Sequence, residues 1–181
     1  MQSPGRGRDN NLSGDDGRSF EELVCQYDRR LYNLVLRLTR DADEAADVTQ
    51  EAFVRAWRAW DGFEGRSAPY SWLCQIAINV CRNRMRDRCR RAETGEDLAG
   101  AEMAADGPSP EESVERMELR DRVRRAVETL PWDYRLVVLL RDCQELSYQE
   151  TAQAAGLSVD VVRTRLARAR GMLRRKLEGY I

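Results

Sequence analysis

Apolar residues recur every three or four positions through the first half of the chain, a spacing that predicts amphipathic helices. Ser19 and Glu22 form a capping box ahead of the first such stretch. Asp41 or Asp43 can cap a second helix ending near Trp60, and a loop rich in glycine and proline follows it. A third helix is expected from about residue 69 to residue 90. Residues 20–91 are therefore predicted to form one helical domain.

The second half begins with an equally strong start signal. Ser109 can cap a helix, Pro110 suits its first position, and Glu112 completes a capping box. This helix is expected to end near Leu130, because Pro131 follows. Further helices are expected over residues 133–143, 148–155 and 158–178. No segment alternates with period two, so the fold class is predicted to be all-α, with two small helical domains.

Charge is distributed unevenly, although Lys and Arg together number 30 and Asp and Glu 31. Seven acidic residues and no basic one lie between Glu93 and Glu112. Arginines are concentrated before and after that segment, in residues 82–91 and 158–178. The acidic segment lacks periodicity and contains Gly, Ala and Pro, so it is predicted to be a flexible linker. The expected organisation is a disordered tail over 1–19, a domain over 20–91, the linker over 92–108 and a domain over 109–181.

Composition argues against several classes of protein. The chain has no histidine, which excludes Ser-His and Cys-His catalysis. Its five cysteines form no CxxC pair, so a zinc site is not expected. We predict no catalytic residue, no metal ligand and no cofactor. No apolar run is long enough to span a bilayer, and the N-terminus does not resemble a signal peptide, so membrane insertion is not expected and a cytoplasmic location is.

The segment LSYQETAQAAGLSVDVVRTRLARAR has the spacing of a helix-turn-helix. Ala152 is small enough for two helices to cross closely, and Gly156, four residues later, suits a turn with positive φ. Val162 is expected to pack back against Ala152. An ordinary helical hairpin could share this spacing, but the second helix and its extension carry an unusual density of arginine. Arginine side chains suit phosphates and the guanine edge, which favours DNA binding.

The loop between the second and third helices predicts a second nucleic-acid contact. It contains Phe63, Tyr70 and Trp72 beside the arginine-rich end of the third helix. Aromatic faces flanked by cations suit unstacked bases of a single strand. Phe63 and Trp72 could equally be core residues, and the arginines a solvated helix end, so both interpretations stay open.

At this point the chain resembles the sigma-70 family of RNA polymerase sigma factors, extracytoplasmic-function (ECF) group. DADEAADVTQEAFVRAW resembles the family's polymerase-clamp helix, and FEGRSAPYSWLCQIAINVCRNRMRDR its minus-10 region. LPWDYRLVVLLRDCQELSYQETAQAAGLSVDVVRTRLARARGMLRRKL resembles region 4, which reads the minus-35 element. The resemblance implies a region 2 helical bundle followed by a region 4 helix-turn-helix. It also implies three partners: core RNA polymerase (through its beta-prime clamp and beta flap), promoter DNA and an anti-sigma factor.

The resemblance also implies which residues serve each partner. Those implied for the polymerase are Asp47, Gln50, Glu51 and Val54, with Trp57 packing that helix. Those implied for the minus-10 element are Phe63, Arg66, Ser67, Tyr70, Trp72, Asn79, Arg82 and Arg86. Those implied for the minus-35 element are Ser158, Arg163, Thr164, Arg165, Ala167 and Arg168, with Arg165 and Arg170 more suited to phosphate contact or packing.

Two other classes remain as alternatives. A polymerase-independent helix-turn-helix regulator would bind a palindromic operator, normally as a dimer, and would leave the clamp-like helix unexplained. A nucleic-acid enzyme such as a recombinase would need a supported nucleophile. The grouped acids Asp41, Asp43, Glu44 and Asp47 lie at an expected helix start, where negative charge suits the helix dipole.

Overall fold

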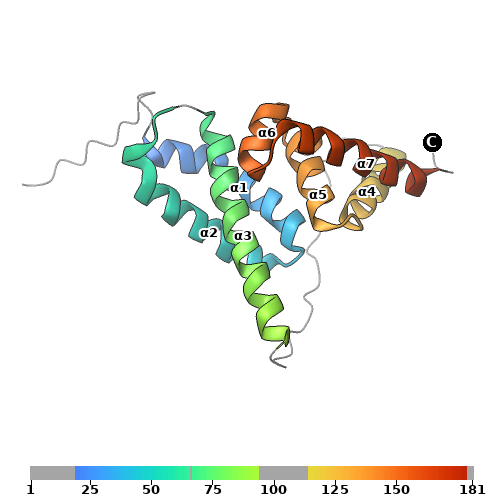
Figure 1. Ribbon diagram of the computed structural model, residues 1–181, viewed down its shortest axis with the longest axis horizontal. Coiled ribbons are helices and arrows are strands. Elements are labelled where there is room, and N and C mark those ends of the chain that lie inside the picture. Colours follow the sequence, from blue (N-terminus) through green and yellow to red (C-terminus); the bar gives the residue numbers. More distant parts are fainter. Residues whose placement is uncertain (1–18, 66, 94–113, 179–181) are drawn as a thin grey trace, which may run out of the picture.

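The computed structural model describes residues 19–65, 67–93 and 114–178, and within these ranges it contains helices and no strand. The expectations for the tail, for Arg66, for most of the linker and for the cap at Ser109 lie outside them. The elements shown in Figure 1 are α1 (Phe20–Thr39), α2 (Ala42–Ala59), the 3₁₀ turn η1 (Trp60–Gly62), α3 (Pro69–Glu93), α4 (Val114–Glu128), α5 (Trp132–Val138), the π-helical turn η2 (Leu139–Cys143), α6 (Tyr148–Ala155) and α7 (Val159–Leu177).

Helix starts follow the predicted caps. The Glu22 N–H donates to the Ser19 hydroxyl at 3.2 Å, and the Ser19 N–H donates back to the Glu22 carboxylate at 3.2 Å. Asp41 rather than Asp43 caps α2, since its carboxylate accepts from the Glu44 N–H at 2.9 Å. The all-α prediction is confirmed, and these helix starts agree with the sequence to within one or two residues.

One helix differs from its prediction. The sequence predicts a single helix over 133–143, but α5 ends at Val138 and the chain continues as the π-helical turn η2. In that turn the Gln144 N–H donates to the Leu139 carbonyl five residues earlier, at 2.9 Å. Apolar periodicity does not distinguish an α-helical turn from a π-helical one, because both bury one face.

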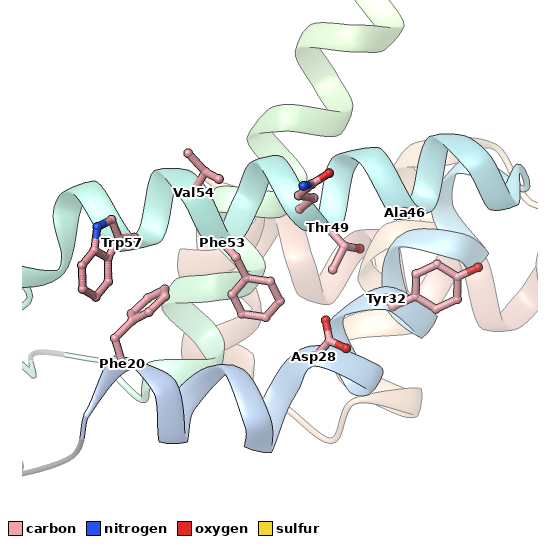
Figure 2. Close-up of a pocket in the computed structure, with 9 residues that line it drawn as sticks. Phe20, Asp28, Tyr32, Ala46, Thr49, Phe53, Val54 and Trp57 are labelled. Atoms are coloured by element: carbon pink, nitrogen blue, oxygen red, sulfur yellow. The ribbon is translucent and has the colours of Figure 1, made fainter.

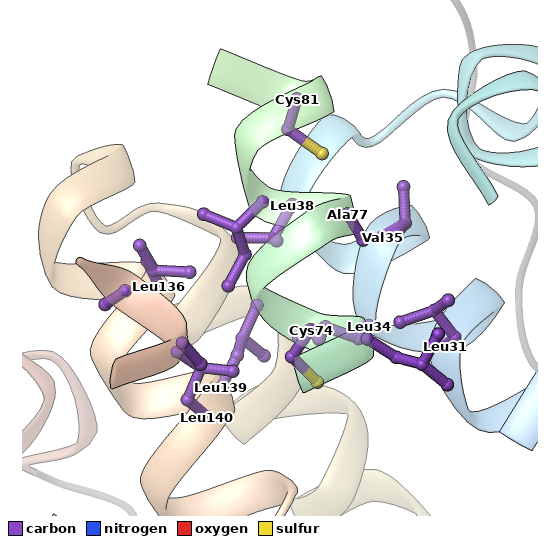
Figure 3. Packing of buried hydrophobic residues seen from close by; sticks show 14 of the residues in the cluster. Leu31, Leu34, Val35, Leu38, Cys74, Ala77, Cys81, Leu136, Leu139 and Leu140 are labelled. Atoms are coloured by element: carbon purple, nitrogen blue, oxygen red, sulfur yellow. The ribbon is translucent and has the colours of Figure 1, made fainter. Parts of the chain in front are cut away.

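The buried residues form one continuous cluster that includes both halves of the chain. Leu31 and Leu34 of α1 and Leu136, Leu139 and Leu140 of the C-terminal half are each at most 1% exposed. Figure 3 shows these side chains with Cys74, Ala77 and Cys81 of α3. The sequence predicts two helical domains, and in this structure they pack against each other.

Helix α3 lies at the boundary between the two halves. It packs on α1 and α2 on one side and on α6 on the other, while its C-terminal end projects from the body of the protein (Figure 1). The arginines of its second half therefore have α2 on one side and the helix-turn-helix near the other. In the part of the chain that the structure describes, no helix is long and apolar enough to cross a lipid bilayer.

Candidate functional site

An apolar groove of about 500 Å³ lies between α1 and α2 (Figure 2). Val54 and Trp57 on α2 are 44% and 41% exposed there, which is unusual for large apolar side chains. Trp57 packs edge-on against Phe20, with ring centroids 5.2 Å apart. The other lining residues are Asp28, Tyr32, Ala46, Thr49, Gln50 and Phe53. The groove therefore offers apolar surface with few polar groups.

The four residues predicted to contact the polymerase divide between two sides of α2. Gln50 and Val54 line the groove. Asp47 and Glu51 instead face α3, where Arg84 lies 3.4 Å from the first carboxylate and 3.0 Å from the second. Burial opposes the charge on Glu51, but hydrogen bonds from Arg84 and Arg55 outweigh it and hold the pKa of Glu51 below its ordinary value.

Sequence reasoning missed part of this groove. Phe20 is 7% exposed and Phe53 is partly buried, so both belong to the core as well as to the groove wall, and the sequence pattern shows only their core role. Trp57 was expected only to pack its helix, yet it is among the most exposed apolar side chains described. Its exposure depends on where α1 ends its contact with α2, which is a tertiary property.

The aromatic residues of the predicted minus-10 loop pack together. Phe63 stacks on Trp60 with centroids 5.5 Å apart, and Trp72 lies 4.7 Å from Phe63. Trp60 is buried, whereas Phe63 and Trp72 are half-buried. Each of these two rings therefore contributes to packing and also keeps part of its surface exposed.

The other predicted minus-10 residues lie on two faces of α3. Asn79 and Arg86 are exposed, and Ser67 is half-exposed before the helix begins. Tyr70 is only 3% exposed, and its hydroxyl donates to the Gln144 side-chain oxygen at 2.8 Å. Arg82 also faces the C-terminal half. In this arrangement Tyr70 and Arg82 are engaged within the protein.

Helices α6 and α7 form the predicted helix-turn-helix. Ser147 and Glu150 make a capping box on α6, and Gly156 ends that helix with φ of 64°. Ser158 caps α7 by accepting from the Val161 N–H at 3.3 Å. Ala152 and Val162 are both buried in the shared cluster, as the spacing predicts.

The exposed face of α7 carries most of the predicted minus-35 residues. Arg163, Thr164, Ala167 and Arg168 are exposed, opposite the buried Val162, Leu166 and Ala169. Such a face is available to the major groove of a duplex.

The arginines of α7 differ in their partners. Arg165 lies 2.8 Å from Asp133, and Arg170 lies 2.6 Å from Asp142. Arg163 has a 3.3 Å contact with the solvated carboxylate of Asp160, and its guanidinium lies 5.8 Å from the centre of the Tyr148 ring. Arg168 has no hydrogen bond or ion pair with any residue that the structure describes. Arg168 is therefore the α7 arginine of the predicted set whose charge is most available to DNA.

Acidic and cysteine side chains of the described residues do not gather into a metal site. Among the described residues, no three His, Cys, Asp or Glu side chains lie close enough together to hold a metal ion. The two surfaces described above are an apolar groove between α1 and α2 and an arginine-bearing exposed face of α7.

Comparison with known families identifies both halves. Residues 23–91 match the model of sigma-70 region 2, and residues 120–173 match that of sigma-70 region 4. The RNA polymerase sigma-H factor of Pseudomonas aeruginosa is 38% identical, over 90% of this chain and 88% of the relative. This chain belongs to the sigma-70 family. The ECF sigma-E factor of Escherichia coli K12 is 37% identical, over 92% of this chain and 90% of the relative.

Solved structures of sigma factors have the same fold. One is the sigma factor RpoE in complex with the anti-sigma factor NepR from Bartonella quintana, with 27% identity and a TM-score of 0.75. It covers 88% of this chain and 96% of that protein. Another is CnrH in complex with the cytosolic domain of CnrY, with 30% identity, a TM-score of 0.61 and 88% coverage of both chains. The chain is thus an ECF sigma factor that directs transcription initiation, and the sigma-70 family is not an enzyme family.

Proposed function

We propose that this sigma factor docks on core RNA polymerase through the α1–α2 groove and reads promoter DNA through α3 and α7. The apolar groove carries this proposal. A self-contained DNA-binding regulator has no need for an exposed valine and tryptophan on a helix remote from its helix-turn-helix. Burying such a surface against a partner contributes about 25 cal/mol for each Å² of apolar area removed from water.

The polymerase partner proposed for the groove is the beta-prime clamp. Gln50 provides a polar group at the groove edge, and Val54 and Trp57 provide the apolar centre. Interfaces of this kind commonly have a buried aromatic anchor surrounded by polar residues. Asp47 and Glu51 are proposed to act at the margin, where Arg84 already holds them in position. The beta flap is the proposed partner of the C-terminal half.

The proposed DNA contacts follow from exposure. Asn79 and Arg86 lie on the open face of α3 and are proposed to contact the minus-10 element together with Phe63, Ser67 and Trp72. Arg163, Thr164 and Arg168 are proposed to contact the minus-35 major groove. The resemblance to the sigma-70 family supports this proposal for the two faces.

An anti-sigma factor is a further proposed partner. The structural relative from Bartonella quintana is bound to one, and the two chains share a fold over nearly their full length. We propose that an inhibitor of this class binds the present chain, and that the chain acts in the cytoplasm, where it meets RNA polymerase.

The first experiment is transcription in vitro from a pool of promoter fragments, with core polymerase and with or without this protein. Transcripts that start at defined sites only when both are present would support the proposal. The contrary result is that the protein does not increase transcription by core polymerase, yet alone retards specific duplexes in a gel. The polymerase-independent regulator would then replace the proposed function.

A pair of variants tests the groove itself. Val54→Glu places a carboxylate in the groove, and Ala59→Glu places the same group on an exposed site of the same helix outside it. Val54→Glu is expected to weaken binding to core polymerase at least about tenfold, since it buries an unpaired charge. Equal affinities of the two variants for core would contradict the groove assignment.

A further inference from the structure

A second cleft, of about 860 Å³, lies between the end of α1, the start of α2, the second half of α3 and the turn from α4 to α5. It shares no lining residue with the α1–α2 groove, and it contains none of the residues proposed above to contact polymerase or DNA. Its volume falls within the range of roughly 300–1,000 Å³ that is typical of sites for small molecules. Three arginines line it, and we call it the arginine cleft.

The two carboxylates in the arginine cleft are already engaged. The Asp41 carboxylate accepts from the Glu44 N–H at 2.9 Å and so caps α2. The Glu44 carboxylate is paired with Arg88, whose charge is therefore balanced within the cleft. The other two arginines, Arg40 and Arg135, form no ion pair with any carboxylate in the part of the chain that the structure describes. The cleft thus has a surplus of positive charge.

Arg135 is the less solvated of these two arginines, at only 4% exposed. Its Nη1 donates to the Glu128 carbonyl at 3.2 Å, whereas its Nε–H is buried and has no hydrogen-bond partner among the described residues. The Glu128 carboxylate also favours the charge on Arg135, but it lies outside the cleft lining and is shared with Arg124, 3.9 Å away.

Arg135 nevertheless remains a cation at neutral pH. Burial, together with the positive charge of Arg40, lowers the pKa of Arg135 to about 10, which is still well above 7. A buried guanidinium without a carboxylate partner costs free energy, and a bound anion would offset that cost. Guanidinium groups suit phosphate in particular, because their planar forks can donate two parallel hydrogen bonds to its oxygens.

The rest of the cleft wall is largely apolar. Leu38 and Leu130 are buried and line it, and Met85 is 36% exposed there. Trp132 is half-buried and also lines the cleft, while the Arg82 guanidinium lies over its ring, 5.3 Å from the centre. An indole ring beside apolar side chains provides a surface for a flat aromatic group. A ligand that fits the whole cleft therefore carries both an anionic and an aromatic part.

We propose that the arginine cleft binds a nucleoside phosphate, with its phosphate held by Arg40 and Arg135 and its base packed against Trp132. Inorganic phosphate alone would leave the apolar wall uncovered, and an uncharged aromatic molecule would leave both arginines without an anion. This inference goes beyond the proposed function and does not depend on binding to polymerase or promoter DNA.

The experiment uses the full-length protein and four probes: ADP, GDP, adenosine and inorganic phosphate. Cys89 is exposed and lines the cleft, whereas Cys25 is exposed on α1 outside it. Mass spectrometry can follow alkylation of both thiols by iodoacetamide in one sample. ADP or GDP at millimolar concentration is expected to slow alkylation of Cys89 several-fold and to leave that of Cys25 unchanged. Adenosine and inorganic phosphate should protect Cys89 much less, since each fills only part of the site.

Two matched pairs of variants test which side chains hold the ligand. Met85→Glu adds a carboxylate to the cleft wall, and Met85→Gln adds a side chain of the same shape without charge. Arg40→Asn removes a guanidinium at a residue with φ of 62°, a conformation that asparagine tolerates, and Arg58→Asn does so at an exposed site on α2 outside the cleft. Arg135 is kept in every variant, because its truncation would also remove the contact with Glu128.

Calorimetric titration with whichever of ADP and GDP protects Cys89 better measures the effect of each variant. Met85→Glu and Arg40→Asn are each expected to weaken its binding at least about tenfold, as a charge-assisted hydrogen bond is lost or an anion is repelled. Met85→Gln and Arg58→Asn should bind it as the wild type does.

Four results would overturn the proposal. Neither ADP nor GDP protects Cys89, or both protect Cys25 equally, which would exclude a nucleotide from this cleft. Adenosine protects as well as ADP, which would remove the role of the arginines. Inorganic phosphate protects as well as ADP, which would remove the role of the apolar wall. Equal affinities within each pair of variants would place the nucleotide elsewhere on the protein. None of these results bears on transcription with core polymerase, so the proposed function is tested separately.

Discussion

Helices α3 and α7 both carry many arginines, but they use them differently. On α3, Arg84 contacts Asp47 and Glu51, Arg88 contacts Glu44, and Arg82 contacts the end of α6. On α7, the carboxylate that pairs with Arg163 is solvated, and Arg168 has no ion-pair or hydrogen-bond partner among the described residues. Local arginine density is therefore a poor guide to a DNA-binding face. The carboxylates and carbonyls of neighbouring helices decide which guanidinium groups remain available.

The same contrast applies to burial. The predicted DNA face of α7 is open to solvent, whereas part of that of α3 lies beneath α6. In the free protein, region 4 is thus better prepared for a duplex than region 2 is for a single strand. Three measurements test this asymmetry, beginning with the cluster that holds the two regions together.

The largest effect is expected from Leu140→Ala. Leu140 is fully buried in the cluster shared by both halves, and such truncations cost about 2–5 kcal/mol of unfolding free energy. Because the cluster is shared, amide protection measured by hydrogen exchange should fall in α1 as well as in α5. Leu119→Ala, at a 44% exposed site, is the control and should change little. Unchanged protection in α1 would show that the halves are stabilised separately.

A smaller effect is expected from Arg168→Ala. Removing this guanidinium should weaken binding of the free chain to its promoter duplex by about 1–3 kcal/mol and lower the salt dependence by about one counterion. Fluorescence anisotropy over a salt series measures both quantities. Arg58→Ala removes the same charge from an exposed site on α2 and should leave duplex affinity nearly unchanged. Equal losses of duplex affinity in both variants would mean that binding depends on the net charge of the protein and not on the position of Arg168.

The smallest effect is expected from Glu150→Gln. Hydrogen bonds with Ser147 lower the pKa of Glu150 in the folded state. A carboxylate with a lowered folded-state pKa stabilises the fold above its unfolded pKa, about 4.3, and this stabilisation is lost as pH falls through the folded value. The variant should be less stable by about 1 kcal/mol or less at pH 7, and the difference should disappear in acid.

Urea unfolding of wild type and variant at several pH values measures that difference. Glu145→Gln removes an exposed carboxylate three residues before Tyr148 without touching the capping box, and it serves as the control. If the difference in unfolding free energy between wild type and Glu150→Gln grew as the pH fell, the pKa of Glu150 would not be lowered in the folded state. The result would also show how far the stability of α6 depends on its cap rather than on its packing against α3.

Local signals in the sequence predicted most of the helical architecture. Capping residues such as Ser19, Asp41 and Ser158 fix helix starts through contacts within three residues, so their patterns are visible in the chain itself. Gly156 was predicted for the same reason, because a left-handed turn favours glycine. The helix-turn-helix and its open basic face follow from these signals together with helical periodicity.

What the sequence did not predict depends on residues far apart in the chain. Arg30 and Gln144 are separated by 114 positions, and neither has a local pattern that points to the other. Asp47 and Glu51 face α3, whereas Gln50 and Val54 line the groove. This difference depends on where α3 crosses α2. Likewise, the exposed apolar residues of the groove and the buried ones beside them follow the same helical period. Long-range packing decided these features.

The π-helical turn η2 places Gln144 between α1 and α3. Such a turn accommodates one more residue than the α-helical turn it replaces. Deleting a single residue within 139–143 would restore ordinary helical winding and rotate every later side chain by about 100° about the helix axis. Gln144 would then point away from Arg30 and Tyr70. A one-codon change in gene length, with no change in the chemistry of any side chain, would be enough to create or abolish the hydrogen bonds of Gln144 with Arg30 and Tyr70 in a descendant of this protein.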